Sequence, residues 1–394
     1  MREKRITMKL DEIKTPAYVI DEKKLRYNLE ILKDVQDRSG AKILLAQKAY
    51  SVYQTYPMIA DYLCGATASG LFEARLAHEE MHPLNNPSKK PENHVFEPAF
   101  DTDEMEELCN ICDHIVFNSF NQLEKHKNIW EKAVRMGKTS VGIRINPEFS
   151  TQEEHEIYDP CSDGSRLGVR LSDMPVTLPD YVDGIHFHTL CEQGFEPLED
   201  TFRDVEKRFE PYLSQIKWIN LGGGHHITRE GYNIEGLISL VKYIRERYSI
   251  DVYLEPGEAI ALDAGYLITT VMDIVKTERM PVLILDTSAA CHMPDVLEMP
   301  YRPPLNGSEE AGELEFTYRL SSRTCLAGDI IGDYSFSEER KIGDRLIFED
   351  MAIYSIVKNN TFNGMPLPDI DILHEDGEVE VLKKFGYEDF KMRL

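Results

Sequence analysis

The sequence predicts an α/β fold, a closed TIM-like (β/α)₈ barrel, followed by an antiparallel β-barrel domain. The chain has 394 residues, which is room for two or three domains. Eight short apolar or β-branched runs lie before residue 258, and most are separated by a segment with helical spacing. Strands that alternate with helices pair in parallel, and eight such units favour a closed barrel over an open sheet.

The predicted barrel begins with a helix over residues 22–38. Asp21 can cap this helix, apolar residues follow at helical spacing, and Gly40 ends it. Later helical segments are Phe120–Met136 and Ile234–Tyr248. The eight strand candidates lie at residues 42–48, 65–70, 94–100, 114–119, 140–147, 184–190, 218–224 and 251–257.

After residue 257 the pattern changes to strand-like runs with Gly, Pro and Asp between them and little helical spacing. This pattern predicts the second, antiparallel domain. We expect the acidic stretch from Asp369 to Glu380 to form a solvated surface. The strand-like runs are residues 266–276, 281–286, 316–321 and 345–357.

The charge and cysteine content limit the partners and the compartment. Lys and Arg number 44 against 69 Asp and Glu, a net charge of −25, so we expect no nucleic-acid partner. The excess acid favours solubility or a cationic substrate. No apolar run is long enough to span a membrane, and the first ten residues do not resemble a secretory signal. The seven cysteines are therefore expected to be reduced thiols in a cytoplasmic protein.

Polar residues and glycines follow several predicted strands, at the barrel end where chemistry gathers in this fold. Each has an ordinary explanation alone, but together they fit a site for an aromatic aldehyde phosphate. Lys48 ends the first strand and Glu255 follows the eighth. The other members are Arg144, His188, Gly222, Gly223 and Gly224.

Each residue type suits one part of such a ligand. A desolvated Lys48 would be a nucleophile for Schiff-base formation, although it could be a plain surface lysine. The glycines let backbone N–H groups surround a phosphate, or they form a tight turn. We expect only one of His186 and His188 to point into the barrel, where a flat imidazole could stack on a ring.

Glu255 is the most discriminating residue of this group. A carboxylate that faces a pyridine nitrogen keeps it protonated and makes the ring a strong electron sink. Decarboxylation needs such a sink for the electrons that CO₂ leaves behind. The alternative is an ion pair of Glu255 with Arg144 that closes a layer of the barrel.

Two metal-like motifs are interpreted as structural. His78–His82 matches H-E-x-x-H, but Pro83 ends its helix at once and no third ligand is evident. Cys109 and Cys112 have C-x-x-C spacing without a second pair. We therefore predict no metal site.

The ordered series of these residues resembles the fold type III pyridoxal-phosphate decarboxylases, which include ornithine, arginine and diaminopimelate decarboxylases. Within this group the likeness is to the carboxynorspermidine (carboxyspermidine) decarboxylases. The resemblance covers nearly the whole chain. Its supporting stretches are residues 15–21, 69–73, 144–147, 165–168, 186–192, 255–259, 291–300, 324–334, 351–354 and 362–364.

The resemblance implies a pyridoxal 5′-phosphate enzyme of polyamine biosynthesis that acts as a homodimer. Lys48 would carry the cofactor, His188 would stack on its ring, and Glu255 would face its nitrogen. The glycine loop, Arg144 and Tyr354 would complete the cofactor site. Cys325, supplied by the neighbouring subunit, would donate the proton that replaces CO₂. The implied domain limits are 23–262 for the barrel and 1–22 with 263–394 for the β domain.

The resemblance also suggests how a polycationic substrate, a carboxylated triamine, would bind. Relatives usually carry Glu-Pro-Gly-Arg, and Glu258 replaces that arginine here. Desolvated ammonium groups need carboxylate partners. The further candidates are Asp286, Asp295, Glu298, Asp329 and Asp333, each of which could also be a capping or solvated residue.

Several alternatives stay open at this point. A related decarboxylase could act on ornithine, arginine, lysine or diaminopimelate. A second alternative is an amino-acid racemase, but racemases of this fold usually set an arginine against the ring nitrogen, where this chain has Glu255. A third is a non-catalytic cofactor carrier, but single-barrel carriers lack the β domain that this chain has the residues to build. Carboxynorspermidine and carboxyspermidine differ by one methylene, worth only about 1–3 kcal/mol in a pocket.

Overall fold

The structure, a computed structural model, describes residues 7–8, 12–152 and 156–394, and the chain divides into two compact units. The barrel unit is Asn28–Ile260. The sheet unit combines Met1–Tyr27 with Ala261–Leu394. The predicted combination of a closed parallel barrel with a separate, mostly antiparallel sheet domain is confirmed.

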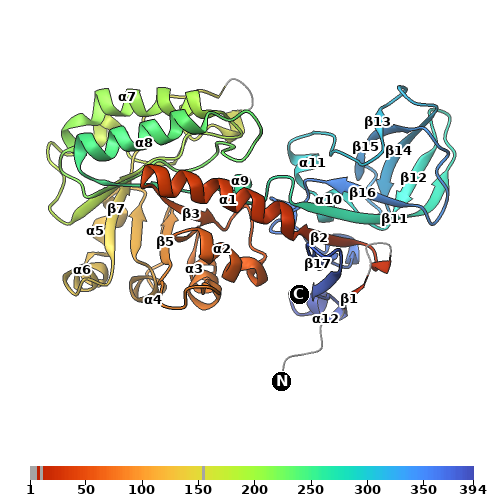
Figure 1. The fold of residues 1–394 in the computed structure, drawn as a ribbon, viewed down its shortest axis with the longest axis horizontal. Helices are drawn as coiled ribbons and strands as arrows, with labels where there is room; N and C mark the ends of the chain where they lie inside the picture. Colours follow the sequence, from red (N-terminus) through yellow and green to blue (C-terminus); the bar gives the residue numbers. More distant parts are fainter. Residues whose placement is uncertain (1–6, 9–11, 153–155) are drawn as a thin grey trace. The chain divides into compact units, whose positions relative to one another are not determined.

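Eight parallel strands close the barrel in the order β10-β3-β4-β5-β6-β7-β8-β9. Figure 1 labels β3, β5 and β7 of this barrel. All eight predicted strands are present, but each ends two to four residues before its predicted limit. The residues past each strand form turns at the barrel mouth, and these turns carry the candidate site. The strands are β3 Lys42–Ala46, β4 Gly65–Ala68, β5 Glu92–Glu97, β6 His114–Phe117, β7 Ser140–Arg144, β8 Val182–His186, β9 Trp218–Asn220 and β10 Asp251–Leu254.

The helix predicted from residue 22 is confirmed as α1, Glu22–Ser39. Gly40 ends it at φ +76°, and its amide donates to the Gln36 carbonyl at 2.8 Å. The single helix predicted over Phe120–Met136 is wrong, because the chain bends at His126, whose ψ is 5°. The other helices of this part are α2 Tyr56–Tyr62, α3 Leu71–Glu80, α4 Met105–Ile111, α5 Phe120–Lys125, α6 Lys127–Arg135, α7 Phe195–Leu213, α8 Ile234–Tyr248 and α9 Glu258–Ala261, with short 3₁₀ turns at Tyr53–Thr55, Glu156–Tyr158 and Leu171–Asp173.

A large indole fills part of the barrel interior. Trp218 on β9 is 4% exposed, and its ring lies over Gly184 of β8 and Gly142 of β7. A Cβ atom on Gly184 would come within 2.1 Å of this ring, and one on Gly142 within 2.3 Å. The two glycines therefore make the space that the indole occupies.

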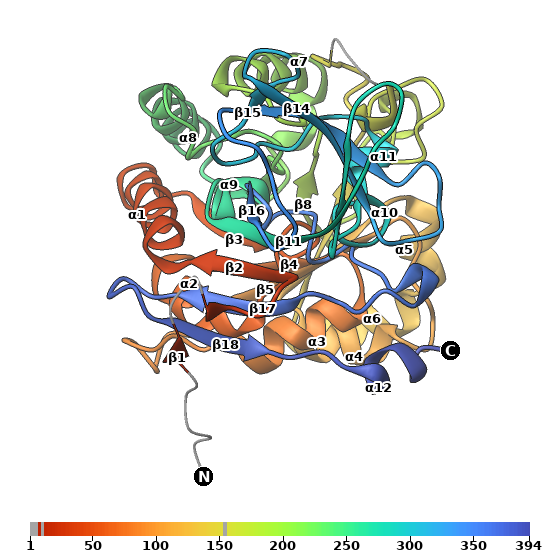
Figure 2. The same ribbon diagram turned by 90° about the vertical axis from the view of Figure 1, so that its right-hand side faces the viewer.

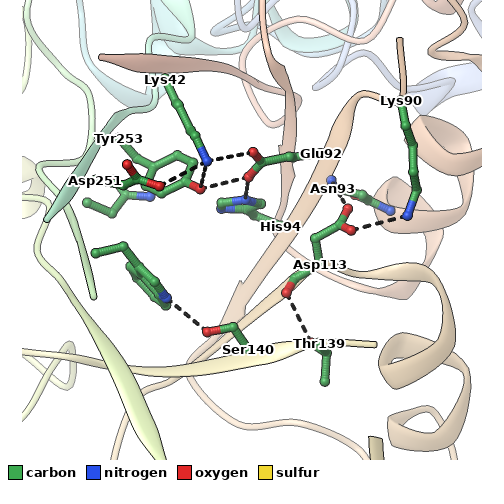
Figure 3. Close-up of polar contacts among 12 residues, drawn as sticks. Lys42, Lys90, Glu92, Asn93, His94, Asp113, Thr139, Ser140, Asp251 and Tyr253 are labelled. Carbon is green, nitrogen blue, oxygen red and sulfur yellow. Dashed lines mark hydrogen bonds and ion pairs between the residues drawn. The ribbon is translucent and has the colours of Figure 1, made fainter. Parts of the chain in front are cut away.

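Polar side chains also occupy the interior near the start of the strands (Figure 3). Lys42 on β3 contacts Glu92 at 3.0 Å and Asp251 at 3.1 Å. The Tyr253 hydroxyl donates to Glu92 at 2.8 Å, and His94 lies 3.0 Å from the same carboxylate. This network links three strands, so we assign it a structural role.

Within the described part of the chain, one group of side chains has spacing that could suit a metal ion. It consists of Glu92, His94 and His114, whose ligand atoms lie within 4.8 Å of one another. The two imidazoles are stacked, with centroids 4.1 Å apart and planes 26° apart, so their nitrogen lone pairs do not converge on one point. Lys42 already neutralises the carboxylate. The geometry thus favours a packed core layer.

The described residues of the sheet unit form ten strands, of which nine follow the order β1-β18-β17-β2-β11-β12-β14-β15-β13, with β16 paired to β11. Most pairs are antiparallel, but β12·β14 and β17·β2 are parallel. The run predicted over residues 345–357 is a strand only to Glu349. The strands are β1 Thr7–Met8, β2 Ala17–Asp21, β11 Gly265–Val275, β12 Val282–Leu285, β13 Glu309–Glu310, β14 Phe316–Ser322, β15 Ile330–Phe336, β16 Arg345–Glu349, β17 Asp369–Leu373 and β18 Val379–Lys383, and the helical turns are α10 Ala289–His292, α11 Asp295–Glu298, Phe362–Gly364 and α12 Tyr387–Lys391.

The solvated surface predicted for Asp369–Glu380 is wrong for its first half. Residues 369–372 of β17 are buried between β2 and β18, and Figure 2 shows these three strands side by side. The exposed part is the turn at Glu375–Glu378. The acidic residues of β17 alternate with Ile370 and Ile372, so the segment has the period of a strand despite its charge.

No helix in the described ranges has the length and apolar content that a membrane crossing requires.

Candidate active site

Lys48 lies two residues beyond β3, at the mouth of the barrel. The segment before it is fixed because Gln47 donates its backbone N–H to the Thr67 carbonyl at 3.2 Å. The Lys48 side chain reaches solvent, and its amine makes no hydrogen bond or ion pair with any described residue. Desolvation by the surrounding protein, followed by the positive charge of Arg144, lowers the pKa of Lys48. The amine is therefore free to act as a nucleophile.

Glu255 follows β10 and is held by two neighbours in the barrel. His186 Nε2 lies 3.2 Å from one carboxylate oxygen, and Asn220 donates to the other at 2.7 Å. Burial alone would raise the pKa of Glu255, but His186 and Asn220 outweigh it and lower the pKa to about 2. The carboxylate is thus ionised at neutral pH. The hydrogen-bond partners of Glu255 are therefore His186 and Asn220, and not Arg144 as in the alternative interpretation.

Both histidines of the sixth strand face the charged groups of the mouth, so the expectation that only one would do so is wrong. Residues two apart along an extended chain share a face. His186 reaches Glu255, while His188 Nδ1 accepts the Gly223 N–H at 3.2 Å. Burial, Lys48 and Arg144 hold the pKa of His188 well below its usual range. His188 is therefore neutral, with its proton on Nε2.

Arg144 ends β7 and is 4% exposed. It donates to the His188 carbonyl at 3.1 Å, and its guanidinium lies 4.6 Å from the centre of the Phe96 ring. Burial lowers the pKa of Arg144 to about 10, and it remains a cation at neutral pH. Arg144 thus fixes the His188 backbone and adds positive charge beside Lys48.

The glycine segment after β9 requires glycine at each position. Gly222 and Gly224 have φ of +70° and +83°, values that side chains disfavour. A Cβ atom on Gly223 would come within 2.1 Å of the Glu255 carbonyl oxygen. The loop therefore packs directly against the segment that carries Glu255.

These features fit pyridoxal 5′-phosphate. Its aldehyde requires an unpaired amine, which Lys48 supplies. Its pyridine nitrogen requires a carboxylate that stays ionised, as Glu255 does. The Gly222–Gly224 turn brings backbone rather than side chains to this end of the barrel, where a phosphate requires N–H donors.

Three residues of this site were not predicted from the sequence. His186 and Asn220 hold Glu255, and His226 lies 2.7 Å from the Glu258 carboxylate. His225 and His226 directly follow the glycine loop in the sequence. This position was the signal that could have identified His226 as a site residue. Glu258 is therefore fixed in the barrel, where its charge raises the pKa of Lys48 against the stronger effect of desolvation.

A group of acidic residues lies near the ends of β4 and β5. A cavity of about 320 Å³ is lined by Glu73, Glu97 and Glu104, together with Ser69–Phe72. Burial and the neighbouring acids raise the pKa of Glu97 to about 7. This part of the barrel thus carries a negative potential that favours cations.

The remaining candidates lie in the sheet unit. Cys325 is exposed, and its amide donates to Asn363 Oδ1 at 2.8 Å. Tyr354 has φ of +53°, and the Lys358 ammonium lies 6.0 Å from the centre of its ring. The structure thus presents the Cys325 thiol to solvent.

The acidic candidates of the sheet unit have partners within that unit. Asp286 accepts from Thr269 at 2.6 Å, and Asp329 accepts from Ser288, Ser322 and Thr324 at 2.5–2.7 Å. Their contacts are those of loop-stabilising carboxylates. The other three pair with cations: Asp333 with Arg319, and Asp295 and Glu298 with Lys358.

Comparison with known proteins shows the family of the chain. The family described as "Pyridoxal-dependent decarboxylase, C-terminal sheet domain" matches residues 17–352. A carboxynorspermidine/carboxyspermidine decarboxylase of Campylobacter jejuni is 41% identical and covers 97% of this chain and 99% of its own. A carboxyaminopropylagmatine decarboxylase of Synechocystis is 39% identical and covers 98% and 97%.

Solved structures give the same result. The crystal structure of carboxynorspermidine decarboxylase complexed with norspermidine, from Campylobacter jejuni, has a TM-score of 0.88 at 40% identity and covers 97% of this chain and 100% of that one. Diaminopimelate decarboxylase from Helicobacter pylori, at 18% identity and a TM-score of 0.80, shares the fold and covers 97% of each chain. The chain therefore belongs to the pyridoxal-dependent decarboxylases and is a carboxy-lyase that uses pyridoxal 5′-phosphate.

Proposed function

We propose that the protein decarboxylates a carboxylated triamine, carboxynorspermidine or carboxyspermidine, to form norspermidine or spermidine in polyamine biosynthesis. The observation that carries the chemistry is the unpaired Lys48 amine in the same barrel mouth as an ionised Glu255. The choice of substrate is supported by the relative that is 41% identical over nearly the full length of both chains.

Each residue of the mouth has a separate task in this proposal. When bound, pyridoxal 5′-phosphate supplies the electron sink for the electron pair that CO₂ leaves behind. Lys48 would hold it covalently, and the Glu255 carboxylate would keep its ring nitrogen protonated. The neutral His188 imidazole would pack on the ring without competing for protons. His186 and Asn220 keep Glu255 oriented and ionised.

The phosphate would be held by the Gly222–Gly224 loop, with Arg144 and Tyr354 completing the cofactor site. Gly223 already gives its N–H to His188, so this bond fixes the imidazole and the loop together. Gly222 likewise gives its N–H to Asn220 Oδ1 at 2.9 Å. The Gly224 N–H and the permanent positive charge at Arg144 would then serve a dianion.

The substrate's amines would be recognised by carboxylates in the barrel. Glu258, held by His226, is the nearest candidate, because its charge acts on Lys48. The acidic cavity of Glu73, Glu97 and Glu104 adds negative potential. Asp286, Asp295, Asp329 and Asp333 stay candidates, although each already has donors in the sheet unit.

We further propose a homodimer in which a second copy supplies Cys325 as the proton donor to the substrate carbon. The exposed thiol supports this role, since a donor to another subunit must be accessible. All seven cysteines are free, which fits a reduced cytoplasmic compartment. The net charge of −25 fits a polycationic substrate and opposes nucleic-acid binding.

A second candidate substrate is carboxyaminopropylagmatine, because the decarboxylase named for it is 39% identical to this chain. It is also a carboxylated polyamine, so the acidic mouth would suit it. The two proposals differ in the group at the far end of the substrate.

Comparative kinetics on one enzyme preparation distinguish these substrates. We expect CO₂ release with the highest kcat/KM from carboxynorspermidine or carboxyspermidine, then from carboxyaminopropylagmatine, with ornithine and diaminopimelate far behind. Faster turnover of ornithine than of the carboxylated triamines would contradict the proposal. Borohydride reduction and peptide mapping should place the cofactor on Lys48, and a label on another lysine would overturn the site.

A further inference from the structure

A small cavity in the sheet unit involves none of the residues proposed for decarboxylation. It has a volume of about 150 Å³. Two carboxylates come from β17, and two lysines come from the segments before β2 and after β18. The lining residues are Lys14, Asp369, Asp371, Val381, Lys384 and Phe385.

The two carboxylates lie on an apolar face of the sheet. Asp371 is paired with Val19 of β2 and with Val381 of β18. Asp369 is paired with Ala17 of β2. Paired residues of adjacent strands share a face, and Ala17 and Val19 belong to a buried apolar cluster. Carboxylates in this position require a polar partner.

Asp371 lacks such a partner. The residue is 1% exposed, and its Oδ1 atom forms no hydrogen bond. Asp369, by contrast, accepts the Phe385 N–H at 3.0 Å. Buried polar atoms without a partner are rare and unfavourable, because the lost hydration is not replaced. Asp371 also lines the cavity, so a ligand there that donates to its carboxylate would replace part of the lost hydration.

The cavity lining limits the chemistry of that ligand. Its lysines, Lys14 and Lys384, are exposed, whereas the carboxylates are buried. Val381 and Phe385 add apolar surface to the lining. The charges of both signs and the short apolar wall match a molecule with an ammonium group, a short carbon chain and an acid group.

We propose that this cavity binds a small zwitterionic amine. Its ammonium group donates to Asp371, and its carboxylate contacts Lys384 and Lys14. A charge-assisted hydrogen bond would give the Asp371 carboxylate a partner, and the Phe385 ring would contact the aliphatic chain.

The test uses the full-length holoenzyme with four probes. β-Alanine and γ-aminobutyrate carry both charges, n-butylammonium carries the cation alone, and butyrate carries the anion alone. Calorimetry should detect the two zwitterions and show weaker binding of the two single-charge probes. Equal binding of n-butylammonium and γ-aminobutyrate would overturn the zwitterion assignment.

A matched pair of variants tests the role of Asp371. Asp371→Asn keeps the shape and removes the charge, and Glu378→Gln removes one exposed charge from the turn between β17 and β18. We expect the first to weaken zwitterion binding by about 10- to 100-fold and the second to leave it unchanged. Both should retain wild-type CO₂ release. Unchanged binding in Asp371→Asn would refute the site.

The pH dependence gives a second test that needs no Asp371 variant. Burial and Asp369 raise the pKa of Asp371 to about 7, and Lys384 opposes them. With Lys14, these are the charged groups among the described residues that line the cavity. Asp371 must lose its proton to pair with an ammonium group, so affinity should rise about tenfold from pH 6 to pH 8.

If Asp371→Asn does not fold, the pH series still tests whether Asp371 binds the ammonium group. In that case Lys384→Gln, at an exposed position, should weaken γ-aminobutyrate binding but not n-butylammonium binding. Affinity that is independent of pH, or equal losses for both probes, would contradict the proposal. Absence of binding by either zwitterion at every pH would also refute it.

Discussion

The carboxylate of Glu255 gives the sharpest prediction at the scale of a single residue. Glu255→Gln keeps the hydrogen bonds of the side chain possible but removes the charge that would face the cofactor nitrogen. We expect kcat to fall by about 100- to 1000-fold, as for the loss of one preorganised electrostatic contact. Steady-state CO₂ release measures this loss.

The pH profile of the wild-type enzyme checks the same residue. The pKa of Glu255 is lowered to about 2, so its charge stays constant from pH 5 to pH 9 and contributes no inflection there. The control is Glu199→Gln on α7, which removes one negative charge from an exposed side chain and should keep full activity. Wild-type kcat in Glu255→Gln would remove Glu255 from the mechanism.

Some residues of the site could be predicted from the sequence, and others could not. Lys48 and Glu255 could be predicted to meet, because chemistry in a closed barrel gathers where strands end. His186 was missed because the two histidines were expected on opposite faces, whereas alternate residues share one. The His226–Glu258 contact joins two loops, and no local pattern specifies which histidine turns toward which carboxylate.

At the scale of elements, the packing of β7, β8 and β9 depends on one indole. Gly184→Ala would place a methyl group 2.1 Å from the Trp218 ring. The ring has no free space to move into, since Gly142 also lies against it. We expect the variant to lose about 1–3 kcal/mol of unfolding free energy, the usual cost of overpacking a core.

Urea unfolding followed by circular dichroism measures this loss. Gly164→Ala is the matched control, because a Cβ atom there meets nothing within 4 Å, and it should stay within about 0.5 kcal/mol of wild type. Gly184→Ala combined with Trp218→Phe should recover part of the stability. A single Gly184→Ala variant as stable as wild type would show that the indole can move.

Elements also show where a sequence pattern misleads. All eight barrel strands were predictable from short apolar runs, but their ends were not, because the runs continue into the turns that carry the site. The strand β17 was missed because Asp369 and Asp371 made an alternating segment resemble a solvated surface. β17 is buried because it lies between β2 and β18. β2 is distant in sequence, and β18 was not among the expected strands.

At the scale of the whole molecule, the proposed dimer predicts that two inactive variants recover activity when they are combined in one dimer. Lys48→Ala and Cys325→Ala should each be nearly inactive alone. If each site takes Lys48 from one copy and Cys325 from the other, a mixed dimer has one intact site and one with both defects. Mixed dimers purified with two affinity tags should therefore recover about half of wild-type activity.

The control is a doubly tagged dimer of two Lys48→Ala copies, which should stay inactive. If both residues of a site came from the same chain, the mixed dimer would have two defective sites and no recovery. Size-exclusion chromatography of each preparation verifies that dimers are compared. The sequence indicated this arrangement through family resemblance alone, since a pattern of residues does not encode which subunit they serve.

The position of β2 in its sheet has a consequence for biosynthesis. Residues 17–21 leave the ribosome long before their parallel neighbour, residues 369–373, is translated. The barrel strands, by contrast, have all been translated by residue 254, and apart from the closing pair β10·β3 each pairs with the next barrel strand along the chain. The nascent chain must therefore hold β2 without this neighbour while the barrel and most of the sheet unit are translated. A stop codon shortly before residue 369 would remove β17 and β18 from within the sheet, rather than trim a dispensable tail.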